Sequence, residues 1–136
     1  MRIKVYSDGG SRGNPGDSAI AFKIMTEDGD LLKAYSKCLG ILTNNQAEYE
    51  ALISALKSAS KFTDQKVTCY LDSELAVKQL NGEYRVKDPE LKTLWSKVQE
   101  LKERFMKVTF TYVPRTNLHI DEVDQLVNDA LDRTKK

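Results

Sequence analysis

The strongest candidates for catalytic or metal-binding residues in this sequence are four acids, because the pattern around each of them predicts burial. Asp8 and Asp72 each close a short run of alternating residues, the two-residue period of a β-strand. Glu48 shares one face of a predicted helix with apolar residues four, seven and eleven positions later. Asp124 lies at the edge of the apolar stripe of the last predicted helix. We therefore expect four carboxylates to point inward from different elements.

Buried carboxylates need a partner, because the loss of hydration disfavours the charged form. A ligand set made only of oxygen atoms, without histidine or cysteine, favours hard cations such as Mg²⁺ or Mn²⁺ over zinc. Patterning alone leaves a second interpretation open. Glu48 could pair with a buried arginine or lysine, and Asp124 could simply favour the positive end of its helix.

The elements that must position these acids follow from hydrophobic periodicity and turn signals. The predicted strands are 3–8, 18–27, 31–39, 67–72 and 108–113. The predicted helices are 45–62, 73–80, a third that starts after Asp88-Pro89 and includes 91–105, and a last that includes 123–131. This order, βββαβααβα, predicts an α/β fold with a five-stranded mixed sheet and flanking helices. The length of 136 residues predicts one domain over residues 1–136.

Local signals set the ends of these elements. The glycines and proline between residues 9 and 16 are expected to break the first strand, which puts Asp8 at its end. Thr43, with Gln46 three residues later, predicts a capping box at the start of the first helix. Because the carboxyl ends of central strands meet at one edge of an open sheet, Asp8 and Asp72 are expected to be neighbours.

Composition narrows the function very little. The chain has 21 Lys and Arg residues against 20 Asp and Glu, a formal net charge of +1, so it lacks the markedly basic balance of many nucleic-acid-binding domains. It has no run of about 20 apolar residues that would span a membrane. Cys38 and Cys69 are far apart in the sequence, so no zinc site or disulfide framework is indicated. We expect a soluble cytoplasmic protein with reduced thiols and no membrane contact.

Three segments, taken together, resemble the type 1 ribonuclease H family: YSDGGSRGNPG at 6–16, TNNQAE at 43–48 and YLDS at 70–73. The similarity extends over nearly the whole chain and includes all four acids in the family's order. It is greatest to the short, archaeal-like branch, without a hybrid-binding domain and without a basic protrusion. The resemblance implies a ribonuclease H-like fold and an endoribonuclease that hydrolyses the RNA strand of RNA/DNA hybrids, giving 5′-phosphate and 3′-hydroxyl ends.

The resemblance also assigns roles to the acids. Asp8 would bridge two Mg²⁺ ions, for which Mn²⁺ would substitute. Glu48 and Asp72 would complete the site nearer the leaving group, and Asp124 would hold the ion that carries the attacking water. Two such ions about 4 Å apart suit the hydrolysis of a phosphodiester, because one activates water and the other stabilises the departing oxygen. Asp121 is a rival for the last position, because the loop before it is longer than is usual in the family.

Selection of RNA requires contacts to 2′-hydroxyl groups, which metal ions do not provide. By resemblance, the residues expected to contact the hybrid are Gly9, Gly10, Asn14, Asn44, Asn45, Gln46 and Ser73, with Tyr84 and Arg85 beside the DNA strand. Helix capping is the alternative role for Asn44 and Asn45. The alternative for the segment 82–87 is an ordinary exposed loop.

An auxiliary residue before the last acid is expected from the same resemblance. Many bacterial relatives carry a histidine there, and the Val-Pro-Arg sequence at 113–115 indicates that Arg115 takes this role. His119 is the competing candidate. An arginine does not exchange protons near neutral pH, so Arg115 would act electrostatically, by binding the scissile phosphate.

Other functions remain open from the sequence. One is a non-catalytic hybrid- or RNA-binding module, which the loss of an acid would indicate. Another is a metal-dependent DNA nuclease of the wider superfamily, which the fold alone does not exclude. Double-stranded RNA is a possible further substrate, because its minor groove displays 2′-hydroxyl groups on both strands. We expect the protein to be a monomer.

Overall fold

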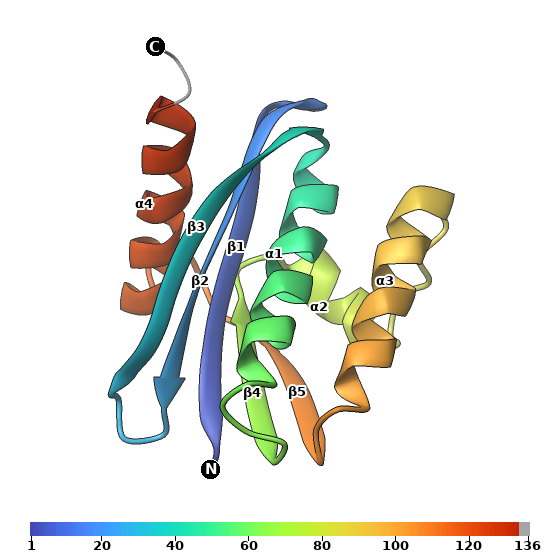
Figure 1. Cartoon of the computed structure of the whole chain (residues 1–136). Helices are drawn as coiled ribbons and strands as arrows, with labels where there is room; N and C mark the ends of the chain where they lie inside the picture. The colour runs from blue at the N-terminus through green and yellow to red at the C-terminus, as the bar shows by residue number, and fades with distance from the viewer. Residues whose placement is uncertain (134–136) are drawn as a thin grey trace.

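The periodicity predicted from the sequence is realised as five strands and four helices, which the computed structural model describes over residues 1–133 (Figure 1). The strands are β1 (Ile3–Gly13), β2 (Gly16–Thr26), β3 (Leu31–Leu42), β4 (Lys66–Leu71) and β5 (Lys107–Tyr112). The helices are α1 (Asn44–Ala59), α2 (Glu74–Leu80), α3 (Pro89–Lys102) and α4 (Leu118–Arg133). The predicted order βββαβααβα is confirmed. Within residues 1–133, no helix is long and apolar enough to cross a membrane.

The sheet has the strand order β3-β2-β1-β4-β5. β2 is antiparallel to both of its neighbours, β1 and β3, and β4 and β5 continue the sheet parallel to β1. Helices α1, α2 and α3 lie on one side of the sheet and α4 lies alone on the other, as Figure 1 shows. The predicted mixed sheet with flanking helices is therefore confirmed.

Side chains cap the starts of three helices, as was predicted for α1 from Thr43 and Gln46 and for α3 from Asp88-Pro89, but not for α2. The Thr43 hydroxyl accepts from the backbone N–H of Gln46, and the Gln46 side chain accepts from the backbone N–H of Thr43, which completes the capping box of α1. Ser73 caps α2 and Asp88 caps α3 in the same manner. These caps satisfy N–H groups that would otherwise lack partners.

Each face of the sheet has its own apolar core. The face toward α1 and α3 buries large side chains, among them Phe22, Ile24 and Leu52. The face toward α4 is built mainly from small or aromatic side chains of the strands, which include Ala19, Ala21 and Tyr6. Successive strand residues therefore alternate between the two cores.

One boundary differs from the prediction and affects the site. The glycines after Asp8 do not end the first strand: β1 continues to Gly13 and pairs with β2 as far as Gly16. The partner strand supplies the backbone hydrogen bonds that the glycine-rich segment needs, so the turn is confined to the residues between Gly13 and Gly16. Asp8 thus lies inside a strand and not at its end. Two helices also end earlier than predicted: α1 ends at Ala59 and not at residue 62, and α3 ends at Lys102 and not at residue 105.

Candidate metal centre

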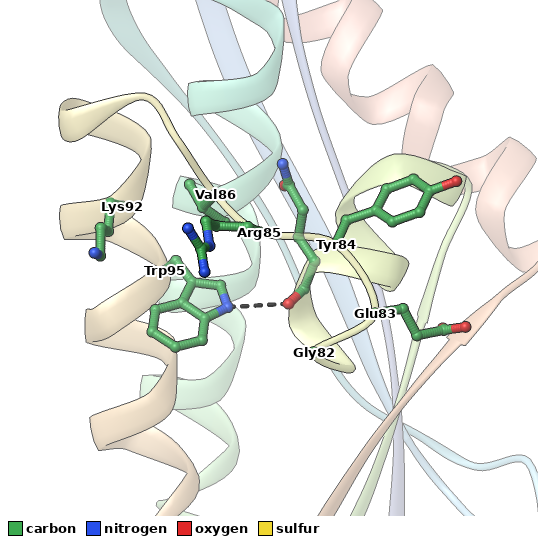
Figure 2. Close-up of a pocket in the computed structure, with 8 residues that line it drawn as sticks. Gly82, Glu83, Tyr84, Arg85, Val86, Lys92 and Trp95 are labelled. Atoms are coloured by element: carbon green, nitrogen blue, oxygen red, sulfur yellow. Dashed lines mark hydrogen bonds between the residues drawn. The ribbon is translucent and has the colours of Figure 1, made fainter.

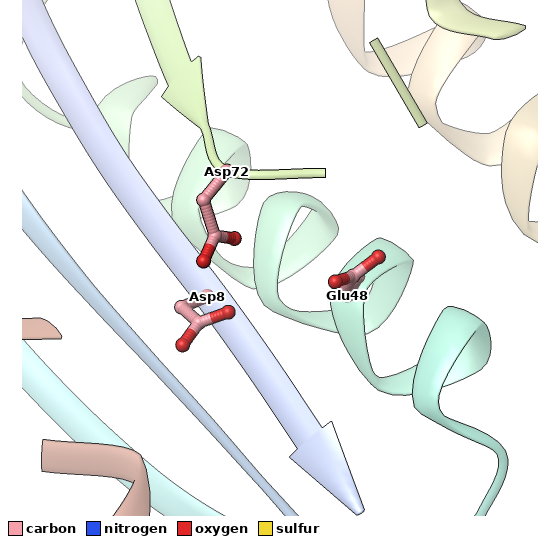
Figure 3. A group of neighbouring side chains, drawn as sticks. All are labelled: Asp8, Glu48 and Asp72. Atoms are coloured by element: carbon pink, nitrogen blue, oxygen red, sulfur yellow. The ribbon is translucent and has the colours of Figure 1, made fainter. Parts of the chain in front are cut away.

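Three acids from three elements meet at one place beside the sheet. One carboxylate oxygen from each of Asp8, Glu48 and Asp72 lies within 4.8 Å of the others. Figure 3 shows the three side chains approaching one another from β1, α1 and the end of β4. In the parallel register Tyr6 lies opposite Tyr70, where the pairing of β1 with β4 stops. Asp8 and Asp72 each follow two residues later, so they are neighbours, as predicted.

The third acid reaches this point because α1 approaches β1 unusually closely. A side chain at Gly9 would overlap the backbone carbonyl of Ala47, the residue before Glu48. Only glycine lets a helix backbone lie so near a strand. Gly9 therefore has a packing role that brings Glu48 toward Asp8, beside the substrate contact expected from the resemblance.

Asp124 enters the same site from the opposite face of the sheet. It lines a cavity of about 180 Å³ together with Asp8, Gly10 and Arg115. The side-chain amide of Asn128, one turn later in α4, donates to the Asp124 carboxylate at 3.3 Å. The rival Asp121 is exposed in the first turn of α4. The structure therefore places Asp124 beside Asp8 and leaves Asp121 in solvent.

The crowding of these carboxylates disfavours their charged forms. Burial, together with the nearby charges of Asp72, Asp124 and Glu48, raises the pKa of Asp8 to about 9. Burial likewise raises the pKa of Glu48 to about 7, although a hydrogen bond with Ser73 and the charge of Arg115 oppose that effect. Asp8 is the acid whose pKa is raised by the charges of all three others. A cation placed among them would favour the charged forms and so oppose both shifts.

The donor set fits a divalent cation. Asp8 Oδ1 is buried, and no hydrogen-bond donor within the described residues 1–133 reaches it. A buried carboxylate oxygen without a donor is costly, and a bound cation is one of the few partners that would satisfy it. Because the converging ligands are all carboxylate oxygens, Mg²⁺ or Mn²⁺ suits the site better than zinc.

Arg115 is the positive side chain in contact with these acids. Its Nε donates to Asp72 Oδ2 at 2.9 Å, and the Arg115 side chain is 64% exposed whereas that of Asp72 is 4% exposed. The hydrogen bond to Asp72 raises the pKa of Arg115 further, so the guanidinium stays charged. His119 lies elsewhere: its ring packs on Tyr6 with centroids 4.7 Å apart, and its Nδ1 is 3.3 Å from Lys23 Nζ. Of the two candidates, only Arg115 contacts an acid of the cluster.

The amide residues expected to meet a substrate are already connected to one another. The Asn44 N–H donates to Asn14 Oδ1 at 2.9 Å, and Asn44 Oδ1 accepts from the N–H of Ser11. Asn44 also lines the acidic cavity, with Gly9 and Gly10. Asn14, Asn45 and Gln46 line a neighbouring pocket of about 280 Å³. These predicted residues therefore form a continuous surface beside the acids.

Tyr84 and Arg85 lie apart from that surface. They line a pocket of about 570 Å³ between the loop after α2 and the helix α3, where Arg85 lies beside Trp95 and the ring of Tyr84 points away from it (Figure 2). The indole Nε1 of Trp95 donates to the carbonyl of Gln79 at 3.1 Å, which holds the ring against the last turn of α2. The pocket thus combines a guanidinium with aromatic rings, but the structure does not bring it together with the acids. Ser73, by contrast, lies at the acids through its contact with Glu48.

Two residues near these sites were not identified from the sequence. Lys23 interrupts the apolar run of β2, and its side chain is only 9% exposed. A lone lysine in such a run is a signal that could have been recognised, because lysine is almost never buried unpaired. Trp95 is the single tryptophan of the chain, but its helical spacing fits a core position equally well, so the sequence did not mark it as a pocket residue.

Comparison of the sequence with known proteins gives a consistent result. The family described as "Reverse transcriptase-like" matches residues 6–130. Ribonuclease HI of Halobacterium salinarum is 40% identical over 132 residues, which cover 96% of this chain and 65% of the relative. The chain spans 36% of the mycobacterial proteins that match next, so it covers less than two thirds of these curated relatives.

Comparison with solved structures identifies proteins that share this fold. RNase H1 of Halobacterium salinarum superposes with a TM-score of 0.93 at 38% identity, and the match covers 98% of this chain and 99% of the other. LC11-RNase H1, isolated from compost and solved in complex with an RNA/DNA hybrid, also gives 0.93, at 41% identity with the same coverage. The strand order and helix placement described above are therefore shared with these proteins.

Proposed function

Because this chain belongs to the ribonuclease H family, we propose that it is an endoribonuclease that hydrolyses the RNA strand of RNA/DNA hybrids. The products would carry 5′-phosphate and 3′-hydroxyl ends. The observation that carries this proposal is the convergence of Asp8, Glu48 and Asp72 around a buried carboxylate oxygen without a donor among residues 1–133. The similarity to an RNase H1 solved with a hybrid supports the choice of substrate.

The four acids would hold two Mg²⁺ ions, for which Mn²⁺ would substitute. When bound, such ions lower the pKa of water and neutralise charge on phosphate oxygens. Asp8 is the natural shared ligand, because its electrostatic neighbours include the other three acids. Glu48 and Asp72 lie together on one side of Asp8, and Asp124 approaches it from α4. This division supports one ion between Asp8, Glu48 and Asp72 and another between Asp8 and Asp124.

Arg115 would bind the scissile phosphate. Its guanidinium is exposed and long enough to leave Asp72, and its planar donors match two phosphate oxygens. The charge it carries does not change near neutral pH, so its contribution is to hold the phosphate and not to transfer a proton.

Two surfaces would bind the two strands. Gly9, Gly10, Asn14, Asn44, Asn45 and Gln46 would contact the RNA strand and its 2′-hydroxyl groups. Tyr84 and Arg85, with Trp95, would contact the backbone of the DNA strand. The net charge of +1 gives little long-range attraction, so affinity for the hybrid should depend on these local contacts.

The protein would act as a monomer in the cytoplasm. All four acids come from one chain, so no second copy is needed to complete the centre. The free thiols Cys38 and Cys69 fit a reducing compartment.

The proposal is tested with labelled RNA/DNA hybrid, double-stranded RNA and double-stranded DNA, each incubated with Mg²⁺ or Mn²⁺. We expect cleavage of the RNA strand of the hybrid, no cleavage by Asp8→Asn or Asp124→Asn, and normal cleavage by the matched control Asp121→Asn. Cleavage of double-stranded RNA would extend the substrate range. A native protein that binds the hybrid without cutting it in either metal would instead be a binding module.

A further inference from the structure

Helix α4 brings Asp124 to the site and packs on the sheet through an apolar cluster that includes Tyr6 and Met25 of the strands. Beneath the helix, β2 contributes Ala19 and Ala21, and these small side chains form a smooth surface with which helix side chains interdigitate little. Apolar contact is non-directional, so it sets the distance of the helix from the sheet more than its axial position. Directional polar contacts therefore help to set that position.

Lys23 supplies such contacts at the start of α4. It lies on β2 directly opposite Tyr6, on the same face of the sheet as Asp8 and about 7 Å from it along the strand direction. Its Nζ donates to Glu122 Oε2 at 2.7 Å and lies 3.3 Å from His119 Nδ1. His119 and Glu122 are three residues apart, so one ammonium group holds one side of the first turn of the helix.

Burial makes this contact stronger than an ordinary surface ion pair. The Lys23 side chain is 9% exposed and that of Glu122 is 48% exposed. The interaction with Lys23 holds the pKa of Glu122 below its usual value. A lysine that has lost its water needs its partner, so the helix turn cannot shift without leaving a buried charge unpaired.

We propose that Lys23 is a positioning residue for Asp124, acting through Glu122 and His119 on the first turn of α4. Asp124 follows Glu122 by two residues, about 3 Å along the helix axis, so a displacement of this turn moves Asp124 relative to Asp8. Further polar contacts between α4 and the strands lie near its far end, where Arg12 pairs with Asp132 and the Cys38 thiol donates to the carbonyl of Ala130. The proposal rests on the proposed function, because it concerns the metal ligand Asp124.

The test compares Lys23→Met, which keeps the length of the side chain, with Glu122→Met, which keeps the length but removes the carboxylate that accepts from Lys23. If Lys23 positions Asp124, both variants lose the directional contact and both weaken metal binding. If Lys23 and Glu122 acted only through their charges, the two variants would change metal affinity in opposite directions. Loss of the positive charge would tighten Mg²⁺ binding, and loss of the negative charge would weaken it. The control is Lys33→Met, another sheet lysine with side-chain contacts, on β3.

Mn²⁺ binding is measured by calorimetry without nucleic acid, and cleavage of the hybrid is measured as a function of Mg²⁺. We expect both variants to bind the weaker of two Mn²⁺ ions roughly tenfold or more less tightly, as is typical when the support of a metal ligand is lost. The variants should show a lower kcat that recovers at high Mg²⁺, with an unchanged KM for the hybrid. Amide exchange should be faster in the first turn of α4, and Lys23→Arg should restore part of the kcat.

The inference is overturned if Lys23→Met lowers only the melting temperature while Mn²⁺ binding and kcat match Lys33→Met, or if the two variants shift metal affinity in opposite directions. Its failure differs from a failure of the proposed function. If only the inference about Lys23 fails, the native protein still cleaves the hybrid. A native protein that binds no divalent metal would overturn both the inference and the proposed function.

Discussion

Arg115 and Asp72 form an ion pair across 43 residues of sequence, with Nε of the guanidinium 2.9 Å from Oδ2 of the carboxylate. The pair places a protein cation at one of the three acids that converge on the candidate metal centre. A divalent ion and Arg115 would therefore compete for the Asp72 carboxylate until a phosphate gives the guanidinium another partner.

Removal of Arg115 should have opposite effects on metal binding and on catalysis. In Arg115→Ala, Mg²⁺ should bind more tightly in the absence of substrate, because Asp72 loses its competing cation. Cleavage of the hybrid should be slower by about 10²-fold, since one charged donor to the phosphate is lost. Calorimetry with Mg²⁺ alone and single-turnover cleavage measure the two effects separately. Equal or weaker metal binding in the variant would contradict the competition.

The stability of the metal-free protein should fall as the pH rises. The pKa values of Asp8, about 9, and Glu48, about 7, lie above those of the unfolded chain, about 4, so the folded state binds more protons between these limits. Stability contributed by protonation is complete below about pH 4 and is lost as the pH passes through the folded values. Asp8→Asn removes the larger part of this dependence.

Urea unfolding at pH 5.5 and pH 8.5, in a chelator, measures this effect. At pH 8.5 Asp8→Asn should be more stable than the native protein by at least about 1.4 kcal/mol, a tenfold change in the unfolding equilibrium. At pH 5.5 the gap should shrink. Asp121→Asn, which removes an exposed charge of α4, should leave the slope with pH unchanged. A native protein that becomes more stable over this interval would refute the assignment of raised pKa values.

Replacement of Gly9 by alanine should destabilise the fold and displace Glu48. The added methyl group would overlap the carbonyl of Ala47, and a backbone atom cannot move aside as a flexible side chain can. Overpacking of this kind costs about 1–3 kcal/mol. Gly10→Ala is the control, because its nearest neighbour would be a Val127 methyl at 3.4 Å. The thermal unfolding of both variants is measured, and Gly9→Ala should melt at the lower temperature. Equal stability would show that the packing of α1 on β1 does not depend on the close contact at Gly9.

Arg85 should affect binding of the hybrid and leave the metal centre intact. Arg85→Gln should weaken hybrid binding and lower by about one the slope of log Kd against log salt concentration, as expected for one lost phosphate contact. Mg²⁺ affinity without nucleic acid should not change, because the pocket of Arg85 is separate from the acids. Lys97→Gln, on the exposed side of α3, provides the matched loss of charge. An unchanged salt slope in Arg85→Gln would exclude the phosphate contact.

Much of the fold was predictable because its signals are local. The capping box at Thr43 and the Asp88-Pro89 start specify where helices begin through contacts within a few residues. The inward direction of Glu48 followed from helical periodicity, and the adjacency of Asp8 and Asp72 followed from the parallel arrangement of central strands.

The remainder depends on contacts between distant segments. Gly9 and Gly10 were interpreted as strand breakers, because the sequence does not reveal that β2 pairs with them or that α1 needs the space at Gly9. The partner of Arg115 is 43 residues away, and the partners of Lys23 are 96 and 99 residues away. No local pattern specifies such pairs, so they became visible only in the structure.

The placement of Asp124 on α4, which covers its face of the sheet alone, also determines when the centre can form during folding. A chain in which β1, β4 and α1 have assembled but α4 has not yet docked holds three of the four acids and lacks the last. Metal occupancy then reports completion of the fold, because binding of the full set of ions stabilises only the docked state. An enzyme built in this way would stay inert toward nucleic acid as a partly folded chain and gain activity with the final packing step.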